Sequence, residues 1–155
     1  MIVSDINLLL YAYDSQSPFH SQAAAWWAGC LSGSEPIGLP HVVIFGFVRI
    51  GTNRRAFQNP LTCKEAAAHV RSWLSQSVVQ VLEPGPNHAQ EVLKVLEDIG
   101  TAANLVTDAQ IAALTLEHDA VLHTADGQFM RFPGLRWFNP LNGAGQTSSR
   151  KHRSS

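Results

Sequence analysis

Short apolar runs alternate with longer amphipathic segments along this chain of 155 residues. Runs rich in β-branched and other apolar side chains are typical of strands that are buried on both faces. Such runs predict five strands, at Ile2–Val3, Ile37–Leu39, Val78–Leu82, Val121–Thr124 and Leu135–Phe138. The segments between them favour helices, at Leu8–Ala12, His20–Leu31, Pro40–Asn53, Thr62–Leu74, Asn87–Ile99 and Asp108–Leu116.

The alternation of strands and helices predicts an α/β fold. Units of strand, helix and strand place successive strands in parallel, so we expect a mostly parallel central sheet with helices on both faces. One domain is expected over residues 1–141, because a chain of 155 residues suffices for one sizeable core. From Asn142 to Ser155 the residues are mainly small, polar and basic, and we expect a flexible basic tail there.

The composition is that of a globular protein, with 45% apolar and 15% charged residues. A net charge of −1 provides no global attraction for nucleic acid, although a local basic patch is compatible with it. Cys30 and Cys63 are too few for a disulfide framework, so we expect reduced thiols and a cytoplasmic location. The longest apolar run, Val42–Val48, is too short to span a bilayer, and no membrane partner is expected.

Three carboxylates occupy equivalent places in the predicted fold. Asp5 follows the first strand, Asp108 stands at the start of a helix, and Asp126 follows the strand Val121–Thr124. Each alone has a structural explanation, because Asp is a favoured helix N-cap and Asp before Gly is a common turn pair. Together they indicate a site, because the carboxyl ends of neighbouring parallel strands converge on one crevice.

The same carboxylates predict a cofactor, because carboxylates that lie close together repel one another unless a cation offsets their charge. Mg²⁺ or Mn²⁺ is expected, since these hard ions prefer oxygen and bind a few carboxylates together with water and phosphate oxygens. Such an ion can polarise a phosphodiester and help to generate hydroxide from water. Asn7 and Thr124 are neutral supporting residues that can orient a carboxylate or a water molecule.

Five segments carry a longer pattern that extends from residue 1 to Leu141. They are VSDINLLLYAYD, SPFHSQAAAWW, the helix that ends in GFVRIGTN, NLVTDAQIAAL and HTADGQFMRFPGLRWFNPL. In this order they resemble PIN-domain ribonucleases, and more narrowly the VapC-type toxins of toxin–antitoxin pairs. The resemblance implies a PIN fold, Mg²⁺- or Mn²⁺-dependent endoribonuclease activity on RNA, a homodimer and a cognate antitoxin that neutralises the toxin. It also implies that Asp5, Asp108 and Asp126 are the catalytic and metal-binding residues.

Two positions depart from the pattern of the family that the chain resembles. The family usually has a Glu three residues before the Arg that matches Arg49, and here that residue is Gly46. Many members also have a second acid two residues after the one that matches Asp126, and here that residue is Gln128. The alternative is therefore a degenerate PIN domain that binds RNA or a protein partner with little or no nuclease activity.

Three arginines give a weaker indication of RNA binding. Arg49, Arg54 and Arg55 follow the helix that is expected to border the cleft, where they can hold RNA phosphates. A solvated helix end, with cations favoured by the helix dipole, explains them equally well. A phosphatase of another α/β fold is disfavoured, because Asn7 and Leu8 stand where such an enzyme needs a second Asp and a Thr or Val after its nucleophile.

Overall fold

One six-stranded sheet runs through the computed structural model, which describes residues 1–147 of the chain. The strands follow the spatial order β3-β2-β1-β4-β5-β6. Their bounds are β1 Ile2–Ser4, β2 Ile37–Pro40, β3 Val79–Leu82, β4 Val121–His123, β5 Trp137–Phe138 and β6 Gly145–Gln146. The first five strands pair in parallel, and only β6 is antiparallel to its neighbour. The predicted α/β fold with a mostly parallel sheet is confirmed.

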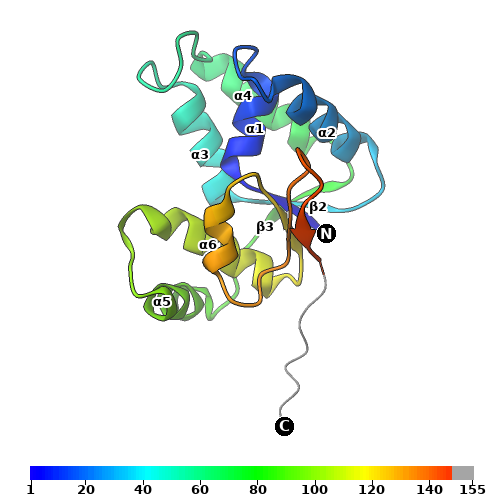
Figure 1. The fold of residues 1–155 in the computed structure, drawn as a ribbon. Helices are drawn as coiled ribbons and strands as arrows, with labels where there is room; N and C mark the ends of the chain where they lie inside the picture. The colour runs from blue at the N-terminus through cyan, green and yellow to red at the C-terminus, as the bar shows by residue number, and fades with distance from the viewer. Residues whose placement is uncertain (148–155) are drawn as a thin grey trace.

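Within residues 1–147, six α-helices and two short 3₁₀ helices surround the sheet. The α-helices are α1 Ile6–Tyr13, α2 His20–Ser32, α3 His41–Gly51, α4 Cys63–Leu74, α5 His88–Ile99 and α6 Val106–Glu117. The 3₁₀ helices are η1 Ala103–Leu105 and η2 Gly127–Arg131. In Figure 1, α1 to α4 gather at the top of the view, and α5 and α6 lie at the lower left. No helix within residues 1–147 is long and apolar enough to cross a membrane.

The central strand β1 brings the first carboxylate to the middle of the sheet. All residues of β1 are buried, as expected for a strand that has a parallel neighbour on each side. Ile2 is level with Ile37 of β2 and with Val121 of β4, and Ser4 is level with His123. Chain segments that follow β1 and β4 therefore leave the sheet side by side, at its carboxyl edge.

The predicted tail begins too early. Gly145 and Gln146 form β6, which pairs with Phe138 and Trp137 of β5, so this part of the segment 142–155 belongs to the sheet. A turn in which Asn139 accepts the N–H of Gly143, at 2.8 Å, returns the chain to β5. The rest of the predicted tail, from residue 148 onwards, lies outside the described residues.

Two predicted element starts also differ from the structure. Helix α1 begins at Ile6 and not at Leu8, because Asp5 caps it. Helix α6 begins at Val106, so Asp108 lies within its first turn and not at its start. The N-cap residue of α6 is Leu105, which makes no side-chain capping hydrogen bond.

Candidate functional site

Asp5, Asp108 and Asp126 line one cavity of about 180 Å³, which we call the acid cavity. Three separate elements supply them, because Asp5 joins β1 to α1, Asp108 lies on α6 and Asp126 precedes η2. The remaining lining residues are polar or basic (Asn7, Arg49, Thr107) or apolar (Ile6, Ile50, Ile111, Phe129). The structure thus brings together the three carboxylates that the sequence singles out.

Asp5 is the most constrained of the three carboxylates, and its residue is only 2% exposed. Its Oδ1 accepts the backbone N–H of Leu8 at 3.0 Å, which caps α1. Its Oδ2 accepts a short hydrogen bond from the hydroxyl of Thr124. The backbone N–H of Asp5 donates to the carbonyl of His123 at 3.1 Å. The end of β4 therefore fixes both the backbone and the carboxylate of Asp5.

Thr124 links two of the acids. Its hydroxyl donates to Asp5, and the same oxygen accepts the backbone N–H of Asp126 at 2.9 Å. Asp126 in turn accepts the backbone N–H of Gln128 at 2.9 Å through its Oδ1. Asp5 and Asp126 are thus helix N-caps and also line the acid cavity. A capping role therefore does not exclude a role in the site for either residue.

Burial and mutual repulsion disfavour charge on two of these acids. Burial raises the pKa of Asp5 to about 6, and the carboxylates of Asp126 and Asp108 add to the rise, while the hydrogen bonds from Leu8 and Thr124 oppose it. Burial also raises the pKa of Asp108 to about 6, with a further contribution from the charge of Asp126. The acid cavity is therefore a place where added positive charge is favourable.

Within residues 1–147, no Lys, Arg or His side chain forms an ion pair with an acid of the cavity. The ion pairs found there join Met1 to Glu35, His88 to Glu117 and Arg136 to Asp119, and none includes an acid of the cavity. Arg49 lines the cavity from α3, but its residue is exposed. Arg54 and Arg55 are exposed in the turn after α3 and do not line the cavity.

The donor set suits a hard divalent cation that keeps some of its water. All three anionic side chains offer carboxylate oxygen, the ligand type that Mg²⁺ and Mn²⁺ prefer. Within residues 1–147, no group of three or more His, Cys, Asp or Glu side chains is placed to hold a metal ion directly. Mg²⁺ usually binds one or two carboxylates directly and retains several waters. The three acids therefore suit Mg²⁺ even though they do not all lie within direct bonding distance of one point.

The supporting residues behave differently from one another. Thr124 is 2% exposed, and its hydroxyl donates a hydrogen bond to the carboxylate of Asp5. Asn7 lines the acid cavity and is exposed, with no side-chain hydrogen bond to an acid. Sequence reasoning missed the apolar lining by Ile6, Ile111 and Phe129, because an apolar side chain carries no signal that distinguishes a cavity wall from the core.

Gly46 is buried, and the side chain of Ile6 fills the space next to it. A Cβ added to Gly46 would lie 2.3 Å from Cδ1 and 3.0 Å from Cγ1 of Ile6. Real Cβ atoms do not approach other atoms so closely, so any side chain at residue 46 requires Ile6 to move. At the other departure, Gln128 is exposed, and only its backbone N–H contacts an acid of the cavity.

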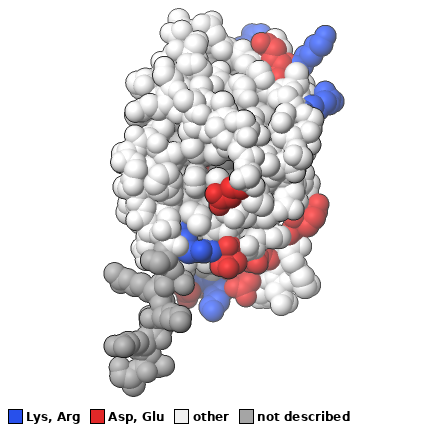
Figure 2. All heavy atoms as spheres, turned by 90° about the vertical axis from the view of Figure 1, so that its right-hand side faces the viewer, with Lys and Arg blue, Asp and Glu red and all other residues white. Residues whose placement is uncertain are grey.

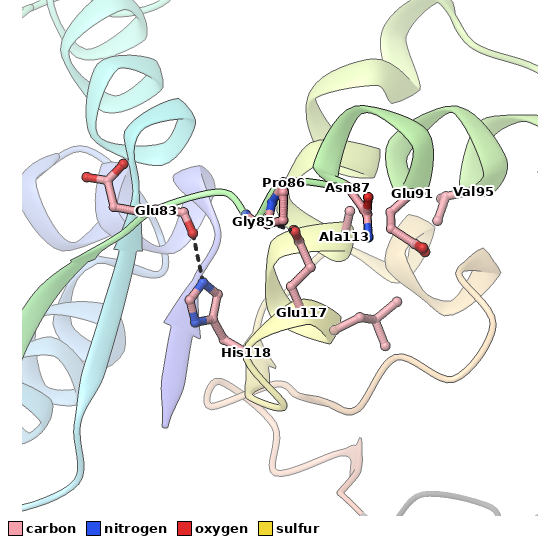
Figure 3. Close-up of a pocket in the computed structure, with 10 residues that line it drawn as sticks. Glu83, Gly85, Pro86, Asn87, Glu91, Val95, Ala113, Glu117 and His118 are labelled. Carbon is pink, nitrogen blue, oxygen red and sulfur yellow. Dashed lines mark hydrogen bonds between the residues drawn. The ribbon is translucent and has the colours of Figure 1, made fainter.

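A larger hollow of about 440 Å³ lies between α5 and α6, and none of the three carboxylates lines it. Figure 3 shows residues that line this hollow. Its Glu117 accepts the N–H of Gly85 at 3.2 Å and contacts Nδ1 of His88 at 2.6 Å. His118 reaches the carbonyl of Glu83 at 3.1 Å. These contacts fasten the β3–α5 connection to the end of α6, so the polar groups of this hollow have a structural role.

Charged side chains are sparse on the face of the molecule that Figure 2 shows. Lys and Arg appear there as a few separate spots, most of them beside Asp or Glu, and they form no continuous basic surface on this face. This distribution agrees with the net charge of −1.

The sequence of this chain matches a known protein family. The model of the PIN domain family matches residues 2–135, which include all three acids. The chain belongs to the PIN domain family.

Within that family, the chain is a VapC-type member. It is 46% identical over 141 residues to ribonuclease VapC33 of Mycobacterium tuberculosis, covering 91% of this chain and 99% of that protein. It is 38% identical to ribonuclease VapC37 of the same organism over 140 residues, covering 90% and 97%.

Solved structures share the fold at low sequence identity. VapC20 of M. tuberculosis, a toxin that cleaves the sarcin–ricin loop, has a TM-score of 0.65 and 18% identity, with 84% of this chain and 93% of that chain covered. VapBC2 of Rickettsia felis, solved with a DNA fragment from its promoter, has a TM-score of 0.64 and 16% identity, with 90% and 98% covered. At these identities the likeness concerns the fold alone.

Proposed function

We propose that this chain is a Mg²⁺-dependent endoribonuclease, with Mn²⁺ as a substitute, and that it is the toxin of a type II toxin–antitoxin pair. The observation that carries the proposal is the acid cavity, where three carboxylates from three elements face one space and two have a pKa of about 6. The curated relatives VapC33 and VapC37 are named ribonucleases, which supports RNA as the substrate. The site of action would be the cytoplasm.

Asp5, Asp108 and Asp126 would hold the cation, directly or through water. A bound cation would polarise the scissile phosphodiester and lower the pKa of a bound water. Thr124 keeps the carboxylate of Asp5 turned towards the cavity by donating its hydroxyl proton. Asn7 would orient a water or a phosphate oxygen from the rim.

Arg49, Arg54 and Arg55 would hold the RNA backbone beside the cavity. Arg49 lines the cavity at the end of α3, and the two others follow in the next turn. Phosphate contacts of this kind position a nucleic acid without reading its sequence. The cognate antitoxin would cover the acid cavity and exclude RNA, and the active form would be a homodimer.

Cleavage of a structured RNA transcript by the purified chain tests the nuclease. We expect fragments with Mg²⁺ or Mn²⁺, none with excess EDTA, and a loss of at least about 100-fold in rate for Asp108→Asn, in line with the loss of a charge-stabilising group. Asp98→Asn is the matched control, because Asp98 is an exposed carboxylate on α5. Cleavage that persists in EDTA, or an Asp108→Asn variant as active as Asp98→Asn, contradicts the proposal.

The second candidate is a degenerate PIN domain that binds RNA or a protein without cutting. Gly46 favours this candidate, because residue 46 supplies no acid and a side chain added there would clash with Ile6. If the protein binds RNA and the RNA stays intact in the presence of Mn²⁺, the degenerate, non-cutting PIN domain is supported. Growth arrest on expression, relieved by Asp108→Asn but not by Asp98→Asn, would support the toxin.

A further inference from the structure

Ile6 and Gly46 form a size-matched contact between α1 and α3. Ile6 is the first residue of α1, directly after Asp5, and it is 8% exposed with part of its surface on the acid cavity. Its Cδ1 occupies the space that a Cβ at Gly46 would need. The isoleucine therefore stands between the backbone of α3 and the cavity, and it can stand there only because residue 46 has no side chain.

This contact leaves the α3 side of the cavity without an anionic side chain. Helix α3 contributes Arg49 and Ile50 to the lining, and neither is an anionic ligand. The three acids come from the other side, from the ends of β1 and β4 and from α6. A cation placed towards α3 would meet the methyl groups of Ile6 and the positive charge of Arg49.

The charge of the cavity also limits how many cations it can hold. Three carboxylates supply at most three negative charges, whereas two divalent cations bring four positive charges. Two-metal sites hold their ions about 3.5–4 Å apart, where their mutual repulsion needs bridging and flanking anions. Beyond the three acids, the oxygen-bearing side chains that line the described cavity are the neutral Asn7 and Thr107, so a second ion would find no further carboxylate there.

We propose that Ile6, seated on Gly46, restricts the acid cavity to a single divalent cation. The inference rests on the proposed function, because it assumes that the cavity binds a cation. Ile6 acts here as a positioning residue: it closes the α3 side and leaves the cation next to Asp5. The chemistry that a cation supplies would then come from one ion held by the acids of the cavity.

Counting bound Mn²⁺ by electron paramagnetic resonance and titration calorimetry at pH 7.5 tests the proposal without measuring activity. The parent should bind one Mn²⁺ per chain. The double variant Ile6→Ala/Gly46→Glu should bind a second Mn²⁺, because the smaller Ala leaves room for the new carboxylate. Ile6→Ala/Gly46→Gln is the matched control, with the same size and no charge, and it should remain at one.

Each stoichiometry has a distinct meaning. A parent that binds no Mn²⁺ contradicts the proposed function, whereas a parent that binds two contradicts only the single-cation inference. A folded Ile6→Ala/Gly46→Glu variant that still binds one Mn²⁺ also overturns the role of Ile6. A second Mn²⁺ in the Gln control would show that space and not charge is limiting, which overturns the argument from charge.

Thermal unfolding tests the contact itself, in case the charged variant does not fold. Gly46→Ala in the parent should lower the midpoint by about 5 °C, the typical effect of overpacking in a domain of this size. In an Ile6→Ala background the same change should be neutral or stabilising, because Ala favours a helix more than Gly does. Equal effects of Gly46→Ala in the two backgrounds would overturn the size-matched contact.

Discussion

The hydroxyl of Thr124 donates to the carboxylate of Asp5 and accepts the backbone N–H of Asp126. One buried oxygen thereby connects two of the three acids of the cavity. A hydroxyl has one proton and two lone pairs, so these two contacts fix the direction of the proton towards Asp5. Thr124 therefore stabilises the ionised form of Asp5 and orients it, although it is not itself an acid.

Thr124→Val should weaken cation binding. Valine has nearly the shape of threonine but cannot donate, and a hydrogen bond to a charged group contributes about 1.5–3 kcal/mol. The pKa of Asp5 should rise above its value of about 6, and Mn²⁺ affinity at pH 6.5 should fall by about tenfold or more. Thr124→Ser, which keeps the hydroxyl, should bind like the parent. A valine variant with parental affinity, measured by titration calorimetry, would remove this role from Thr124.

Cation binding should depend steeply on pH between 5 and 7. Asp5 and Asp108 both have a pKa of about 6, so protons compete with the cation in this range. Mn²⁺ affinity should rise by up to about 100-fold per pH unit below pH 6, where two protons must leave, and level off above pH 7. Carboxylates with ordinary pKa values near 3.8 would give a flat profile over this range, and that result would contradict the assignment.

Asp108→Asn should stabilise the fold at neutral pH in the absence of divalent cations. The pKa of Asp108 is higher in the folded chain than its ordinary value of 3.8, so the folded state resists ionisation more than the unfolded state does. This penalty is fully present above the folded pKa of about 6, decreases as the pH falls, and is absent below the unfolded pKa.

Differential scanning calorimetry in EDTA measures this effect. Asp108→Asn should unfold at a higher temperature than the parent at pH 7.5 and at the same temperature near pH 3.5. Asp98→Asn, at an exposed position, should match the parent at both pH values. A lower midpoint for Asp108→Asn at pH 7.5 would show that the acid is not under electrostatic strain.

Arg49→Gln should weaken RNA binding in a salt-dependent manner. Each phosphate contact to a single strand contributes about −0.7 to the slope of log affinity against log salt concentration. In an Asp108→Asn background that prevents cleavage, the slope should become less negative by about that amount for Arg49→Gln. Arg71→Gln, on the exposed surface of α4, is the control and should leave the slope unchanged. Fluorescence anisotropy of a labelled RNA measures both, and an unchanged slope for Arg49→Gln would place the RNA elsewhere.

The parallel sheet and the acids at its carboxyl edge could be predicted from the sequence. Buried parallel strands require apolar runs such as Ile2–Val3 and Val121–Leu122, and polar residues stand out where such runs end. Asp5 and Asp126 are visible for this reason. Asp108 is visible through the TDA segment, although α6 begins two residues earlier than expected.

The remaining features depend on contacts that no local pattern records. Strand β6 consists of Gly145 and Gln146, which have no apolar alternation, and only the turn at Asn139 brings them to β5. The contact of Ile6 with Gly46 joins two helices, and each residue alone resembles ordinary core. The hydrogen bond of 3.0 Å from Trp26 to Nδ1 of His123 likewise links α2 to β4 across 97 positions of the chain.

The separation of Asp5 and Thr124 along the chain sets when the site can exist during synthesis. Their hydrogen bond spans 119 positions, and β4 can pair with β1 only after α6 has been made. At typical elongation rates of about 5–20 residues per second, Thr124 is synthesised on the order of 10 s after Asp5. A nascent or truncated chain that ends before β4 lacks both Thr124 and Asp126, so an incomplete translation product carries no assembled site.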